Sequence, residues 1–112
     1  MTELYSLPKI PGSYEIESIY SYPVNSLITG ADYNDELKLV ALVGYDFNWN
    51  QYFYKISNFD LSNMDKTVIE KFKIPVGKAQ IEAVKIIDES SFWITSEDEG
   101  NGFPRLFKFK IM

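Results

Sequence analysis

The stretch IEAVKIIDESSFWITSED, Ile81 to Asp98, alternates apolar and polar side chains on both sides of a short polar break. Alternation with a period of two residues is typical of β-strands, and the Asp, Glu and Ser between the two runs are turn residues. A related phrase, IESIYSYPVNSLITGAD, occupies Ile16 to Asp32. The first stretch therefore predicts two adjacent antiparallel strands, and the second predicts another unit of similar build.

The rest of the chain has the same character, because short runs rich in β-branched and aromatic residues are separated by Gly, Pro, Asn and Asp. Connections this short require antiparallel pairing. The run Leu37–Tyr45 is apolar on both faces, which predicts a central strand covered on both sides. Strands are predicted over residues 13–22, 27–33, 37–45, 51–58, 66–74, 80–87, 92–96 and 103–112.

The two related phrases extend into longer aligned segments. KIPGSYEIES at residues 9–18 matches KIPVGKAQIEA at residues 73–83, and LIT at 27–29 matches WIT at 93–95. Recurring units that carry about four short strands are typical of β-propeller blades. The fold class predicted is therefore all-β, with an extended arm over residues 1–12 and two four-stranded antiparallel propeller-like blades over roughly 13–60 and 66–112.

Two segments carry a resemblance to known proteins. Residues 72–111 resemble one blade of the bacterial β-propellers described as phytase-like, esterase-like or lactonase-like. Their sequence is FKIPVGKAQIEAVKIIDESSFWITSEDEGNGFPRLFKFKI. ITGADYNDELKLVALVGYD, residues 28–46, resembles the penultimate blade of secreted or lipid-anchored members. The resemblance implies C-terminal propeller blades and a secreted or lipid-anchored location, although residues 1–12 lack a signal-peptide pattern.

Propellers of that kind need more blades than 112 residues supply. Two blades alone leave sheet faces and strand edges open, and such surfaces favour association. We therefore expect either self-association or the remaining blades of a larger propeller as the partner.

The charge limits the other partners. The chain has 16 acidic and 11 basic residues, a net charge of −5, and its Lys residues are scattered rather than clustered. This pattern does not provide the basic surface that nucleic acid or an anionic membrane requires. The longest aliphatic run, Leu39–Val43, is too short to span a membrane.

The chain contains no Cys and no His. This composition excludes disulfides, thiol nucleophiles, Ser-His-Asp triads and ordinary zinc sites. No catalytic residue is assigned, and calcium is the cofactor that the sequence leaves open, with magnesium as the similar oxygen-liganded ion.

The resemblance implies that Glu17 and Glu82 lie on inner strands that line a channel, while Asp32 and Glu97 end the Ile-Thr strands. One interpretation makes these four carboxylates calcium ligands, because calcium binds several oxygen atoms. The other makes them hydrogen-bond acceptors or solvated groups, and we prefer it.

A ligand-binding surface is predicted from four further residues: Gly30, Tyr45, Trp49 and Tyr52. Gly30 permits either close approach of a ligand or a β-bulge, and the bulge is favoured. The aromatic residues, together with Phe47 and Tyr54, suit stacking against a sugar or peptide. Packing within a core would use the same side chains, and this interpretation is favoured.

The function predicted is a non-catalytic binding or structural module within a larger or self-assembled β-propeller. One alternative is a fragment of a calcium-dependent phytase-like or lactonase-like hydrolase. The other alternative is a small acidic protein-interaction module, whose open faces and edges form the interface.

Overall fold

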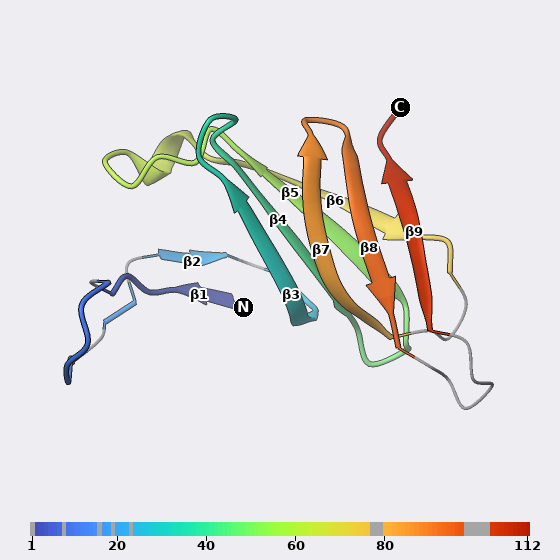
Figure 1. Ribbon diagram of the computed structural model, residues 1–112, viewed down its shortest axis with the longest axis horizontal. Coiled ribbons are helices and arrows are strands. Elements are labelled where there is room, and N and C mark those ends of the chain that lie inside the picture. The colour runs from blue at the N-terminus through green and yellow to red at the C-terminus, as the bar shows by residue number, and fades with distance from the viewer. Residues whose placement is uncertain are drawn as a thin grey trace.

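The computed structural model describes residues 2–7, 9–15, 17–18, 20–22, 24–76, 80–97 and 104–112. Within these residues the chain is all-β, with nine strands in three antiparallel sheets and one 3-10 turn, η1 (Met64–Lys66) (Figure 1). The strands are β1 (Thr2–Leu4), β2 (Tyr20–Tyr22), β3 (Leu27–Asn34), β4 (Leu39–Tyr45), β5 (Gln51–Ser57), β6 (Val68–Ile74), β7 (Ile81–Asp88), β8 (Ser91–Ser96) and β9 (Arg105–Lys110).

A four-stranded sheet is formed by β3–β6 in sequence order. Its strands follow one another through short turns, so each pairs with its chain neighbour. β4 pairs on both sides, and its side chains pack on both faces: Ala41 and Val43 belong to one buried cluster and Leu42 to another. The prediction of a central, covered strand is confirmed.

A three-stranded sheet is formed by β7, β8 and β9. The β7–β8 hairpin is the one that the Ile81–Asp98 stretch predicts, and its turn is fixed by Asp88, whose Oδ1 accepts from the Ser90 backbone N at 2.9 Å. Register shifts between Ile81 and Ala83 and between Ile86 and Asp88 bend β7.

The two larger sheets pack face to face and bury the main core between them. Phe53 on β5 is fully buried and contacts rings from both sheets. Its ring centroid lies 4.4 Å from that of Phe92, 5.2 Å from that of Phe109 and 6.2 Å from that of Phe72. The sheets neither close into a barrel nor stand as propeller blades.

The sheets approach most closely where β3 lies beside β7 (Figure 1). Three polar side chains bind the β7 backbone there. Thr29 Oγ1 donates to Ile81 O, Gln51 Oε1 accepts from Ile81 N at 3.1 Å, and Asp32 Oδ2 accepts from Ile86 N at 2.8 Å. These bonds satisfy backbone groups along the edge of β7, so this edge is covered by the neighbouring sheet.

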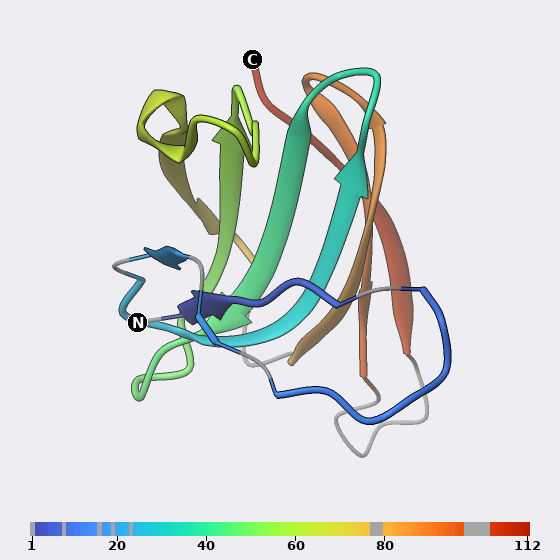
Figure 2. The ribbon, with the colours of Figure 1, turned by 90° about the vertical axis from the view of Figure 1, so that its left-hand side faces the viewer.

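The other face of the four-stranded sheet carries a second core, which includes Leu42, Tyr54 and Ile56. β1 and β2 form a two-stranded sheet whose Leu4 and Tyr22 pack onto that core. Figure 2 shows this small sheet as a separate layer in front of the strands. The extended arm is therefore partly a strand.

The structure corrects the first predicted strand. Of the described residues within 13–22, only Tyr20–Tyr22 form a strand, and it pairs with β1. Residues 13–15 and 17–18 are exposed. Two of them are Glu15 and Glu17, so a strand here would bury too little apolar area to offset the cost of ordering it.

The expected pair of four-stranded sheets is also corrected. Residues 66–74 were assigned to the second unit, but β6 pairs with β5, with Phe53 opposite Phe72. The break from Asn58 to Thr67 folds back through η1, which brings β6 alongside β5 and places Phe72 on the core. The second sheet therefore has three strands in the described part of the chain.

No helix within the described ranges is long and apolar enough to cross a membrane.

Replacing Phe53 with Ala should destabilise the protein by about 3–5 kcal/mol, because the change leaves a cavity between both sheets. Urea unfolding measures this loss. Met112→Ala is the control: Met112 is fully exposed and lies outside the core, so its removal should change the free energy of unfolding by less than about 0.5 kcal/mol. Equal losses for the two variants would contradict the packing described.

Candidate functional site

The four carboxylates predicted as calcium ligands lie in different surroundings. Asp32 accepts from the Ile86 backbone and lies 3.6 Å from Lys85 Nζ. Glu82 is exposed on β7, Glu17 is exposed before β2, and Glu97 follows β8. Among the described residues, no group of three acidic, His or Cys side chains is placed to hold a metal ion. Calcium binding therefore stays a prediction, and the residues predicted for it form no such group.

Gly30 lies where the two sheets meet. A Cβ atom at this position would lie 2.7 Å from Glu82 O and 3.0 Å from Ala83 Cα on β7. A register shift between Ile28 and Gly30 places a bulge at the same point. Gly30 therefore permits close approach of a backbone, but this backbone belongs to β7.

The predicted aromatic residues come together around the β4–β5 turn, Asp46–Asn50, here called the aromatic loop. Tyr45 and Trp49 stack with their ring centroids 5.1 Å apart and an interplanar angle of 9°. Tyr52 follows on β5, where its ring packs against the second core and its hydroxyl donates to Asp46 Oδ2 at 3.3 Å. Lys71 Nζ lies 4.0 Å from the centroid of this ring. Tyr54 is buried in the same core, so these two members of the aromatic set serve packing.

Asp46 fixes the conformation of the aromatic loop. Its Oδ1 accepts from the backbone N of Asn48 at 2.9 Å and of Asn50 at 3.0 Å. Its Oδ2 accepts from Asn50 Nδ2 at 3.1 Å and from the Tyr52 hydroxyl at 3.3 Å. One carboxylate thus satisfies four donors, which is how Asp stabilises a tight turn.

Trp49 has a φ of 63°, in the left-handed region that bulky residues rarely adopt. Its backbone N donates to Asp46 O at 3.1 Å, and its O accepts from Gln51 Nε2 at 3.2 Å. Backbone strain of this kind persists only where surrounding contacts enforce it, and it is common in binding loops. The loop therefore holds Trp49 in one orientation.

The aromatic loop borders a depression of about 760 Å³ whose other wall runs from Val24 to Leu27, the first residue of β3. Phe47 is fully exposed at the loop and Trp49 is 49% exposed. The sequence indicated Tyr45, Trp49 and Tyr52 but not the Val24–Leu27 wall, because no local pattern reports which distant segment lies beside a turn.

Comparison with protein families, with curated proteins and with solved structures gives no significant match. The resemblance to β-propellers therefore stays a prediction, and the geometry of the chain itself has to support any function.

Gly30→Ala should destabilise the protein by about 1–3 kcal/mol, because the added methyl group meets the backbone of β7 rather than a flexible side chain. Gly12→Ala is the matched control, since a Cβ there meets only the end of the Tyr14 side chain at 3.3 Å. Thermal and urea unfolding of the two variants measure the difference. A Gly30→Ala variant as stable as Gly12→Ala would contradict the close approach of β3 and β7.

Acid should loosen the aromatic loop. The pKa of Asp46 lies below its ordinary value of 3.8, chiefly because the Asn50 side chain donates to the carboxylate, and further because of the Asn50 and Asn48 backbone and the Tyr52 hydroxyl; burial opposes the shift. A lowered pKa stabilises the folded loop above pH 3.8, and this stabilisation is lost as the pH falls through the folded-state pKa.

NMR titration of the Asp46 carboxyl measures its pKa. The fluorescence of Trp49 follows the loop, in a Trp93→Phe variant that leaves Trp49 as the one Trp residue of the sequence. Asn50→Ala should move the titration up toward 3.8. Asn48→Ala should not, because Asn48 donates through its backbone. An upward shift of the same size in both variants would show that the Asn50 amide is not the main cause.

Proposed function

We propose that this chain is a non-catalytic binding module that associates with further copies of itself, with the aromatic loop as one of the two contact surfaces. The observation that carries this proposal is the full exposure of Phe47 on a loop whose backbone is fixed by Asp46. A fixed backbone lowers the conformational entropy that the loop loses on binding, and exposed aromatic side chains are enriched at protein interfaces.

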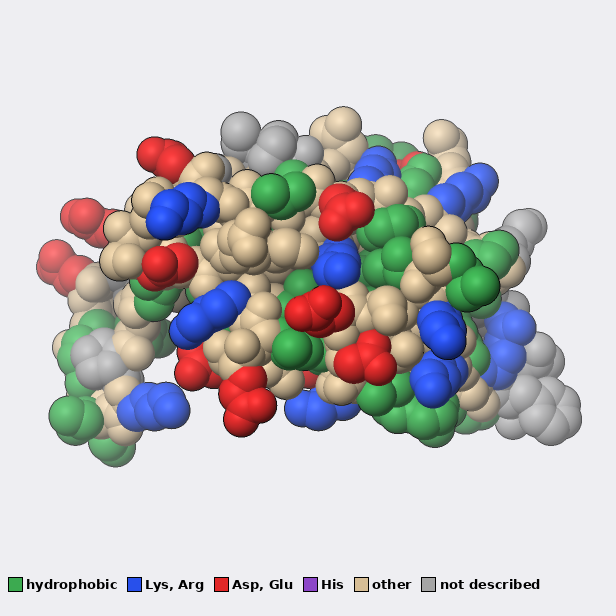
Figure 3. Space-filling view, turned by 90° about the horizontal axis from the view of Figure 1, so that it is seen from above, with side chains coloured by type: hydrophobic (Ala, Val, Ile, Leu, Met, Phe, Trp, Pro, Cys, Tyr) green, Lys and Arg blue, Asp and Glu red, His purple; other side chains and the backbone are tan. Residues whose placement is uncertain are grey.

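The complementary surface is the outer face of the three-stranded sheet, where Trp93 lies between Lys85 and Lys108 on the neighbouring strands. Trp93 is 43% exposed and Leu106 on β9 is 66% exposed. Figure 3 shows basic and hydrophobic side chains gathered over the end of the molecule that holds this sheet. Trp93 and Leu106 are exposed apolar side chains on an otherwise basic face, and they supply its apolar contact area.

The loop and the sheet face lie on different sides of the molecule, as Figure 2 shows. A contact between the loop of one copy and the sheet face of the next is heterologous, and it forms a ring if the rotation between copies closes. In such a ring, sheets from several copies would stand side by side. Under this proposal each of the two larger sheets acts as one propeller-like blade, and other copies of the chain supply the remaining blades.

Sedimentation over a concentration series tests the proposal. The unmodified chain should associate, and Phe47→Ser and Trp93→Lys should each weaken association by at least about tenfold. Leu7→Ser is the control, because it removes an exposed apolar side chain from the arm and should leave association unchanged. A chain that stays monomeric at about 1 mM, the weak limit of specific association, would refute the proposal.

Mixing the two variants distinguishes the heterologous contact from a symmetric one. Phe47→Ser keeps an intact sheet face and Trp93→Lys keeps an intact loop, so the mixture should form a heterodimer that neither variant forms alone. A mixture that stays monomeric would exclude the head-to-tail contact.

A further inference from the structure

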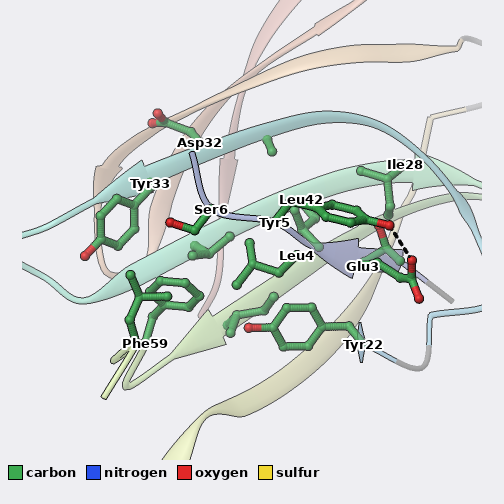
Figure 4. Close-up of a pocket in the computed structure, with 15 residues that line it drawn as sticks. Glu3, Leu4, Tyr5, Ser6, Tyr22, Ile28, Asp32, Tyr33, Leu42 and Phe59 are labelled. Atoms are coloured by element: carbon green, nitrogen blue, oxygen red, sulfur yellow. Dashed lines mark hydrogen bonds between the residues drawn. The ribbon is translucent and has the colours of Figure 1, made fainter. Parts of the chain in front are cut away.

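A pocket of about 540 Å³ lies between β1 and the second core of the four-stranded sheet. Its size falls within the range of about 300–1000 Å³ that is usual for small-molecule sites. Figure 4 shows side chains from both sides of the pocket, and the apolar ones include Leu4, Tyr22, Ile28, Leu42 and Phe59. Leu42 and Phe59 are buried. The pocket is therefore mostly apolar, with a floor of well-packed side chains.

The charges on the lining are carboxylates. The residues that line the pocket include Glu3 and Asp32 and no Lys or Arg. Asp32 is bound to the Ile86 backbone and paired with Lys85, so its carboxylate is already occupied on the β7 side. Glu3 is exposed at the rim of the pocket, where its Oε2 accepts from the Tyr5 hydroxyl at 2.7 Å (Figure 4).

Glu3 keeps capacity for another donor. Among the described residues its Oε1 accepts a longer bond from Ser21 Oγ at 3.4 Å, and a carboxylate has about four acceptor positions. The pKa of Tyr5 is raised, first by its hydrogen bond to Glu3 and then by the negative charge of that carboxylate. This part of the rim therefore has a negative potential and an accepting group.

We propose that this pocket binds a small amphiphile with an aliphatic tail and a cationic amine head, the tail against the apolar floor and the amine at Glu3. An ammonium group donates charge-assisted hydrogen bonds to a carboxylate. A fatty acid or phosphate ester would place its anionic head where the described lining residues offer no Lys or Arg side chain. This site is independent of the self-association proposed above.

β1 forms one wall of the pocket. It has three residues and one neighbouring strand, β2, so few interactions hold it over the pocket. Segments with few buried contacts open more easily than the core around them. The pocket is already open to solvent at exposed lining residues such as Ala31 and Tyr33, and movement of β1 would widen it while leaving the two larger sheets in place.

Titration calorimetry with decylammonium, decanol and decanoate, each below its micelle concentration, tests the proposal. The three probes share one tail and differ in head-group charge. Decylammonium should bind at least about tenfold more tightly than decanoate. The ammonium head donates a charge-assisted hydrogen bond to Glu3, whereas the carboxylate head of decanoate is repelled by it. Equal affinities, or no binding of decylammonium, would overturn the proposal.

Three variants locate the site. Glu3→Gln should reduce the preference for decylammonium over decanol toward unity. Glu17→Gln makes the same change of net charge in an exposed segment that does not line the pocket, so the preference should stay. Ala31→Trp, at an exposed position of the lining, should abolish binding of all three probes, with circular dichroism confirming that the variant folds.

Equal effects of Glu3→Gln and Glu17→Gln would show that the preference for decylammonium comes from the net negative charge of the protein and not from Glu3. Binding that survives in a folded Ala31→Trp variant would place the amphiphile elsewhere. Either result would overturn the assignment of this pocket, and neither would affect the sedimentation behaviour predicted for Phe47→Ser.

Discussion

Phe53 lies between the two larger sheets and contacts Phe72 on its own sheet and Phe92 and Phe109 on the other. Interior packing of this kind fixes how far apart two sheets lie and which residues face each other. Successive side chains of a strand point to opposite faces. Because Phe53 points into the main core, Tyr54 and Ile56 point to the other face of the sheet, where they belong to the second core. Both the second core and the pocket beneath β1 depend on this arrangement.

The junction of β3 and β7 shows how the same packing decides the roles of polar residues. Thr29, Asp32 and Gln51 bind the backbone of β7, and Gly30 leaves room for it. Two of the predicted site residues, Gly30 and Asp32, thus serve the contact between sheets. The surfaces proposed for binding therefore lie elsewhere. They are the aromatic loop, the outer face with Trp93, and the rim of the pocket at Glu3.

Much of the candidate site was readable from local pattern. The phrase YDFNWNQY, residues 45–52, places aromatic residues on both sides of an Asp- and Asn-rich turn, and this local order is enough to predict that Tyr45 and Trp49 lie close together, as their stacked rings do. Tyr52 instead packs against the second core. The pocket beneath β1 had no such signal. Its lining comes from the five strands β1 to β5 and from the segments after β1 and β5, and no spacing along the chain reports that these elements converge.

The sequence by itself determined the strands, because alternation of apolar residues and the turn residues between them act over a few positions: seven of the strands, β3 to β9, lie where the pattern places them. Only the tertiary structure decided their partners. The repeated Ile-Thr phrase forms β3 at the edge of one sheet and β8 in the middle of another. Strand pairing depends on which apolar faces can be buried together, as Phe72 on β6 is buried opposite Phe53 on β5. That burial is a property of the whole chain and not of any one segment.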